Sequence, residues 1–98
     1  QRRVRVRPIG DVVCEYYLRL QVRDRPGVLA RIAGDLGDQG ISIASVVQRD
    51  RRSGGSVPVV IRTHEARERD LRKALDRLRS RAAVHGAPVA IRIEPNPG

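Results

Sequence analysis

Apolar and polar residues alternate over residues 16–23, and the spacing of the apolar residues then changes to that of a helix. Leu18, Leu20 and Val22 occupy every second position, which predicts a strand with one buried face. Over residues 27–39 the apolar residues recur at intervals of three and four, which predicts an amphipathic helix. The segment Asp24-Arg25-Pro26-Gly27 therefore turns the chain from a strand into a helix.

The rest of the chain predicts two strands, a second helix and a final strand. Gly40 is expected to end the first helix. Val46 is out of phase with Ile41 and Ile43, so we expect a bulge near Ala44-Ser45. The elements predicted after the first helix are a strand over residues 41–48, a polar, glycine-rich loop over 49–56, a strand over 57–63, a helix over 66–82 and a strand over 89–93. This βαββαβ order predicts an α+β, ferredoxin-like sandwich, in which a four-stranded antiparallel sheet carries two helices on one face.

A chain of 98 residues suits one domain with one modest core. We expect residues 16–94 to form the domain, residues 1–15 to connect it to an upstream part, and residues 95–98 to be a tail. The first residue is Gln1 rather than methionine, so we expect a piece of a longer protein. Val4 and Val6 alternate with arginines, which leaves a short edge strand open there. The predicted core consists of Leu18, Leu20, Val22, Leu29, Ile32, Leu36, Ile43, Val59, Ile61, Leu71, Leu75, Leu78, Ile91 and Ile93.

The charge balance raises a nucleic-acid hypothesis, which the distribution of the charge weakens. The formal net charge is +9, from 20 lysines and arginines against 11 aspartates and glutamates. Arginines in the first seven residues supply part of this excess outside any predicted element of the domain. Tyr16 and Tyr17 are the only aromatic residues, so a base-stacking platform is missing. We therefore expect no nucleic-acid partner.

The sequence also lacks the residue patterns of membrane proteins, metal sites and catalytic sites. No apolar run has the length of a membrane span, and nothing resembles a secretory signal. Cys14 is the only cysteine, which fits a cytoplasmic protein without disulfides. His64 and His85 have no ligand residues at metal-site spacing, and Ser42 has no histidine or carboxylate nearby to form a triad. We expect no catalytic residue and no metal site in this chain.

The segment between the first strand and the first helix has two interpretations. Asp24 can cap the helix, Pro26 fixes φ near the helix start, and Gly27 permits close backbone approach. These properties describe a well-made turn. They also describe a small-molecule site, because free amides at a helix start attract carboxylates. The local chemistry leaves both interpretations open.

Two motifs together resemble those of the ACT domain family. ACT domains are small ferredoxin-like regulatory modules that bind amino acids. The motifs are Asp24-Arg25-Pro26-Gly27-Val28-Leu29 and, one helix later, Gly40-Ile41-Ser42-Ile43. The stretches Tyr16-Tyr17-Leu18-Arg19-Leu20, Ser45-Val46-Val47-Gln48 and residues 57–66 are similar to the C-terminal ACT domain of homoserine dehydrogenases. The resemblance runs over residues 16–94. It implies a parent oxidoreductase that reduces aspartate semialdehyde to homoserine in threonine and methionine biosynthesis, with its catalytic and NAD(P)-binding parts upstream.

The resemblance also implies where an effector would bind. In ACT domains, effectors commonly bind where the first strand-to-helix loop of one copy meets the second strand of a neighbouring copy. Carried onto this sequence, the effector-binding residues are Asp24, Arg25, Pro26, Gly27, Val28, Leu29, Ile41, Ser42 and Ile43. The amides of residues 27–29 would bind the effector carboxylate, and Asp24 would bind its ammonium group.

Two functions remain open on this basis. One is allosteric regulation by threonine, the end product of the implied pathway, at the interface of a homodimer or higher homo-oligomer. The other is oligomerisation alone, without ligand binding, through unpaired edge strands. In either case NAD(P) would be bound by the parent enzyme, and no cofactor is expected in this chain.

Overall fold

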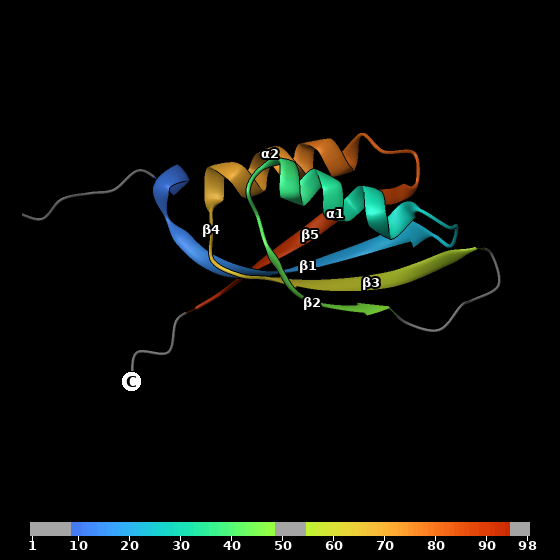
Figure 1. Ribbon diagram of the computed structural model, residues 1–98, viewed down its shortest axis with the longest axis horizontal. Coiled ribbons are helices and arrows are strands. Elements are labelled where there is room, and N and C mark those ends of the chain that lie inside the picture. The colour runs from blue at the N-terminus through green and yellow to red at the C-terminus, as the bar shows by residue number, and fades with distance from the viewer. Residues whose placement is uncertain (1–8, 49–54, 95–98) are drawn as a thin grey trace, which may run out of the picture.

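The computed structural model describes residues 9–48 and 55–94, and within them two helices lie on one face of an antiparallel sheet (Figure 1). The expectations for an edge strand near residues 4–6, for most of the loop at 49–56 and for the tail fall outside the described residues. The elements are η1 (Ile9–Asp11), β1 (Val13–Arg23), α1 (Val28–Asp38), β2 (Ile43–Gln48), β3 (Ser56–Thr63), β4 (Ala66–Arg67), α2 (Glu68–Arg79) and β5 (Val84–Ile93). The predicted ferredoxin-like fold is confirmed.

The sheet has one more strand than the sequence predicted. β1 lies in the middle, with β3 and β5 as antiparallel neighbours, and β2 pairs with the far side of β3. The additional strand is β4, in which Ala66 and Arg67 pair with Cys14 and Val13 at the start of β1. Residues 66 and 67 were predicted to begin the second helix, and β1 was predicted to begin only at Tyr16. Both differences arise because the start of β1 pairs with a segment more than fifty residues away.

The irregularities of the sheet follow local sequence features. The pairing of β2 with β3 shifts between Ile43 and Ser45, which confirms the predicted bulge. At the same end of β3, the hydroxyl of the fully buried Thr63 accepts a hydrogen bond of 3.2 Å from the backbone N–H of Tyr16. This side chain satisfies a buried backbone donor where the β1–β3 ladder ends. Within the described residues β2 pairs only with β3, so β2 is an edge strand.

The end of α1 is a Schellman motif centred on the predicted glycine. Gly40 adopts a φ of 73°, a left-handed conformation that glycine adopts without strain. The N–H of Gly40 donates to Gly37 O at 2.9 Å, and the N–H of Ile41 donates to Leu36 O at 3.0 Å. The motif ends α1 and directs the chain back along the sheet into β2. It confirms the role predicted for Gly40.

The core lies between the sheet and the two helices. Nine of the fourteen predicted core residues are buried, namely Leu18, Leu20, Val22, Ile32, Leu36, Val59, Ile61, Leu71 and Leu78. Leu29, Ile43 and Leu75 are partly buried against this cluster. The prediction was wrong for Ile91, whose side chain is 45% exposed, and Ile93 is only partly buried. Ile91 pairs with Tyr17, which points to the open face of the sheet, so the inward face of β5 was assigned backwards.

Candidate functional site

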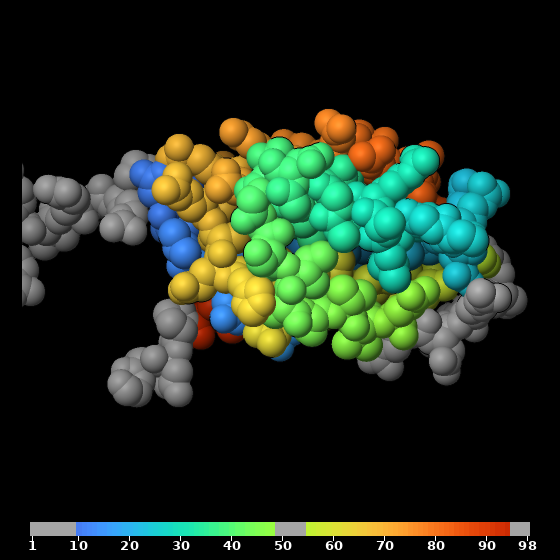
Figure 2. Space-filling model, in the orientation of Figure 1, coloured from blue at the N-terminus to red at the C-terminus, as the bar shows by residue number. Residues whose placement is uncertain are grey.

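The β1–α1 turn, defined as residues 24–29 and so including the first two residues of α1, lies at one end of the molecule, where β1 and the start of α1 meet (Figures 1 and 2). Gly27 occupies the N-cap position of α1 with a φ of 86°, which favours glycine there. The N–H of Asp24 donates to Gly55 O at 2.9 Å, which ties the turn to the residue preceding β3. The turn is thus held by the backbone.

The structure changes two of the roles predicted for the turn. Gly27, rather than Asp24, is the N-cap residue, and no side-chain cap hydrogen bond is present there among the described residues, so the capping role predicted for Asp24 is wrong. The N–H of Val28 donates to Arg25 O at 3.3 Å, so this amide already has a weak partner within the turn. Of the three amides predicted to bind a carboxylate, those of Gly27 and Leu29 are the better candidates.

A cavity of about 270 Å³ lies between this turn and β2, and we call it the β2-side cavity. All six predicted effector-binding residues of the turn line it: Asp24, Arg25, Pro26, Gly27, Val28 and Leu29. Val22, Arg23 and Gln48 complete the lining. Gln48 was not among the predicted site residues. It is the last residue of β2, which runs from the far end of α1 back towards the turn. Its amide can donate and accept hydrogen bonds.

The other three predicted site residues lie at the opposite end of α1. The carbonyl of Ser42 accepts a hydrogen bond of 2.9 Å from the N–H of His64, just beyond the end of β3. Since α1 has 11 residues, it separates Ser42 from the turn by about 16 Å, at 1.5 Å per residue. The Ser42 side chain is exposed, Ile41 is buried and Ile43 is partly buried. One copy therefore does not bring Ser42 to the turn, and a contact with the effector would require a second copy.

A second and larger cavity of about 450 Å³ lies on the other side of the turn, towards α2, and we call it the arginine cavity. Its walls come from the turn, from the first part of α1 and from the α2–β5 connection. The lining residues are Arg23, residues 25–28, Arg31, Ile32 and residues 80–84. Both cavities contain Arg23 and residues 25–28, so the β1–α1 turn forms a wall between them.

An ion pair between Asp35 of α1 and Arg81 of the α2–β5 connection joins these two segments next to the arginine cavity. Asp35 lies on α1 and is only 3% exposed, although a carboxylate on a helix is usually solvated. Its carboxylate accepts two hydrogen bonds from Arg81, from Nε at 3.0 Å and from Nη2 at 2.7 Å. The hydrogen bonds from Arg81 lower the pKa of Asp35, against the opposing effect of burial. A signal for this burial was present in the sequence, because Asp35 follows the core residue Ile32 by three positions.

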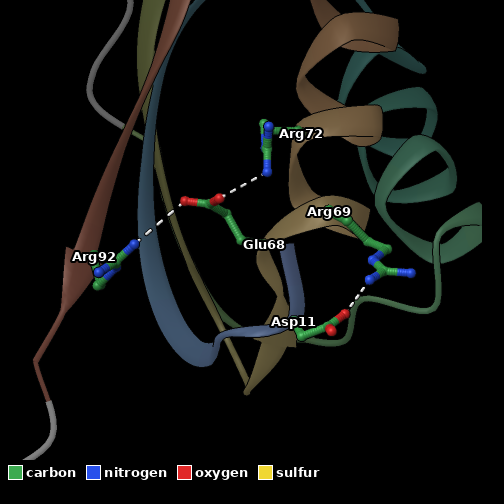
Figure 3. A network of polar contacts seen from close by, with 5 residues as sticks. All are labelled: Asp11, Glu68, Arg69, Arg72 and Arg92. Carbon is green, nitrogen blue, oxygen red and sulfur yellow. Dashed lines mark hydrogen bonds and ion pairs between the residues drawn. The ribbon is translucent and has the colours of Figure 1, made fainter. Parts of the chain in front are cut away.

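Carboxylates also pair with the arginines at the other end of α2 (Figure 3). Glu68 accepts from Arg72 at 3.0 Å and from Arg92 of β5 at 3.3 Å. Arg69 pairs with Asp11 of η1, which ties the start of α2 to the start of the described chain. These pairs join α2 to the sheet and to η1, and each arginine has an acidic partner. The charges of these arginines are therefore balanced by carboxylates of the chain itself, without a ligand.

Neither a metal-ligand cluster nor a membrane-spanning helix is found in the described part of the chain. Residues 9–48 and 55–94 contain no group of three or more histidine, cysteine, aspartate or glutamate side chains that could hold a metal ion. No helix in these ranges is long and apolar enough to cross a membrane. The candidate functional site is the β1–α1 turn with the β2-side cavity and the arginine cavity.

Comparisons with known proteins relate most of the chain to one family and to one group of enzymes. The family described as ACT domain matches residues 16–83. Homoserine dehydrogenase of Pseudomonas aeruginosa is 39% identical over 88 residues, which cover 89% of this chain and 20% of that protein. Homoserine dehydrogenase of Synechocystis is 36% identical over 93 residues, covering 95% of this chain and 21% of that protein. The chain thus spans about a fifth of the length of these relatives.

Solved structures give the same result for the fold. A homoserine dehydrogenase from Thiobacillus denitrificans superimposes with a TM-score of 0.79 at 37% identity, over 89% of this chain and 19% of that one. The regulatory subunit of aspartate kinase from Thermus thermophilus, in a ligand-free form, superimposes with a TM-score of 0.61 at 17% identity, over 81% of this chain and 51% of that one. At this low identity, the second match supports the fold alone.

Proposed function

This chain belongs to the ACT domain family, and from that premise we propose that it is the regulatory domain of a homoserine dehydrogenase and binds an amino-acid effector, threonine being the first candidate. The observation that carries the proposal is the β2-side cavity, which all six predicted turn residues line. The similarity to homoserine dehydrogenases over nearly the whole chain supports the parent enzyme. Relatives of this kind are metabolic enzymes, which supports a cytoplasmic location.

The chemistry of the cavity suits a small zwitterion. The N–H groups of Gly27 and Leu29 at the start of α1 would donate to the effector carboxylate. Asp24 would accept hydrogen bonds from the ammonium group in exchange for part of its present interactions. Gln48 from the same copy and Ser42 from a neighbouring copy would contact the effector side chain. A threonine hydroxyl can donate to and accept from either of them.

The chain itself does not fit the NAD(P) that the parent enzyme would use. Dinucleotide sites place Gly-x-Gly-x-x-Gly between a strand and a helix, so that the backbone can approach the pyrophosphate. Here the strand-to-helix turn reads Asp24-Arg25-Pro26-Gly27, with one glycine and a proline. We therefore propose that hydride transfer takes place in another part of the parent protein and that this domain modulates it.

A second candidate function, oligomerisation without a ligand, has its own supporting observation. β2 is an edge strand, and the face of the sheet away from the helices exposes several apolar side chains. The exposed fractions are 42% for Tyr17, 53% for Val47, 49% for Val89 and 45% for Ile91. Such a surface is typical of contacts between copies. An oligomer that forms equally well without amino acids would favour this function.

The test is calorimetric titration of the chain with threonine and, separately, with other amino acids. Threonine at a hundredfold excess over its dissociation constant should stabilise the domain by about 2.7 kcal/mol. Ser42→Ala should weaken threonine binding by roughly 0.5–1.5 kcal/mol, the value of one hydrogen bond, without changing the melting temperature of the ligand-free domain. Ser45→Ala, also an exposed serine, is the matched control. Equal binding by the wild type and Ser42→Ala would remove Ser42 from the site.

A further inference from the structure

The arginine cavity brings together two stretches that are far apart in the sequence, residues 23–32 and residues 80–84. The β1–α1 turn and the α2–β5 connection lie at the same end of the domain (Figure 1). The backbone N–H of Arg23 donates to Ala83 O at 2.8 Å, which joins these two segments. Arg31 and Ile32 of α1 contribute the third wall. A volume of about 450 Å³ lies within the range of small-molecule sites.

Four arginines line this cavity, and their charges are poorly balanced. Arg81 is held by Asp35 through two hydrogen bonds, so its charge has a partner. The other three are Arg23, Arg25 and Arg31. In residues 9–48 and 55–94, no carboxylate lies within ion-pair distance of any of these three. Around α2, by contrast, Arg69, Arg72, Arg79 and Arg92 all have acidic partners.

Guanidinium groups that share one concave site repel one another and raise the local positive potential. A bound anion relieves that repulsion, and the gain increases with the charge of the anion. Guanidinium groups bind phosphate oxygens in pairs of parallel hydrogen bonds. Arg23 at the end of β1, Arg25 in the turn and Arg31 on α1 suit a tetrahedral phosphate group, which presents oxygens in several directions, better than a planar carboxylate.

We propose that the arginine cavity binds a small organic phosphate carrying at least two negative charges, with Arg23, Arg25 and Arg31 as its ligands. Asp35 holds Arg81, which forms part of one wall of the cavity. The site is distinct from the amino-acid site proposed above, which lies on the other side of the turn. The inference does not depend on that function, because phosphate binding can be measured without any amino acid.

Isothermal titration of the chain with inorganic pyrophosphate, at constant ionic strength, tests this proposal, and citrate serves as a carboxylate of comparable charge. Pyrophosphate should bind saturably, with one ion per chain, and more tightly than citrate. Arg31→Gln should weaken the binding by roughly tenfold, because a hydrogen bond between charged groups contributes at least that factor. Arg19→Gln removes the same charge from the open face of the sheet and should weaken the binding less than twofold.

Nuclear magnetic resonance spectra during the same titration locate the site. Amide signals of Arg25, Gly27, Val28 and residues 80–84 should shift on pyrophosphate addition, whereas those of Ser42 and Ile91 should not. Should Arg31→Gln fail to fold, Arg25→Gln, which changes an exposed residue of the turn, replaces it. Citrate binding as tight as pyrophosphate overturns the phosphate assignment. Lack of saturable binding, or equal losses in the arginine variant and in Arg19→Gln, overturns the site itself.

Discussion

Replacement of Asp35 by asparagine tests the ion pair that connects α1 to the α2–β5 connection. The Asp35 side chain is 2% exposed, and Arg81 donates to it at 2.7 and 3.0 Å. A second guanidinium, that of Arg77, lies with its Nε 3.8 Å from Asp35 Oδ1. Loss of one partner of a buried ion pair costs about 3–5 kcal/mol. The Arg81 side chain is 30% exposed, so water can solvate the released guanidinium and reduce this cost. We expect Asp35→Asn to lower the free energy of unfolding by about 2–3 kcal/mol.

Urea denaturation at pH 7, monitored by circular dichroism, measures this change. Asp38→Asn is the matched control, because it makes the same chemical change at an exposed position of the same helix. It should change the free energy of unfolding by no more than about 0.5 kcal/mol. The double variant with Arg81→Gln should show a coupling of more than about 1 kcal/mol between the two sites. Additive effects, or a cost for Asp35→Asn as small as that of the control, would refute the assigned role.

The same pair predicts a dependence on acid pH. Arg81 lowers the pKa of Asp35 below its ordinary value of 3.8, so the folded state favours the ionised carboxylate more than the unfolded state does. The pair therefore contributes its stabilisation above that ordinary value and loses it as the pH falls through the folded-state pKa. The stability difference between the wild type and Asp35→Asn should thus shrink below about pH 4. A difference that stays constant down to pH 2 would contradict this.

Three further predictions concern the core, the alkaline limit and the isolated chain. Leu20→Ala removes a side chain only 3% exposed and should cost roughly 2–5 kcal/mol in urea denaturation, whereas Ile91→Ala on the open face should cost far less. Burial raises the pKa of Tyr16 to about 12 from 10.0, so the wild type should lose stability from pH 10 to pH 12, and Tyr16→Phe should lose less over that range. The 98-residue chain should sediment as a dimer or larger species and show no NAD(P)H-dependent homoserine turnover; a monomer at high micromolar concentration or measurable turnover would count against these expectations.

Elements whose signals are local could be predicted from the sequence. The alternation in β1, the stripes of α1 and α2 and the glycine that ends α1 each depend on residues within a few positions. The structure departs from the prediction where a distant partner decides the outcome. β4 forms because Ala66 and Arg67 pair with the start of β1. Ile91 faces outwards because it pairs with Tyr17 of β1, whose side chain lies on the open face of the sheet. Since β5 has apolar residues on both faces, the alternation of its residues does not show which face is buried.

The site shows the same division. The six residues of the β1–α1 turn form one contiguous motif, so the sequence could predict that they lie together at one cavity. Gln48 and Arg81 escaped prediction, since each reaches the turn from a segment that returns to it only in the folded chain. Asp35 escaped because a carboxylate on a helix is usually solvated, and its partner lies 46 residues away.

The position of the turn between two cavities has a consequence for regulation. Arg23 and residues 25–28 contribute to both cavities, so a ligand in one would order the wall of the other. Thermodynamic linkage requires that such an effect be reciprocal: if pyrophosphate changes the affinity for threonine, threonine changes the affinity for pyrophosphate by the same factor. Titration of each ligand with and without a saturating amount of the other measures both factors. Because the two factors must be equal, their agreement checks that both titrations reach equilibrium. Factors above one would support coupling through the turn, and factors of one would mean that the turn is rigid enough to keep the two sites independent.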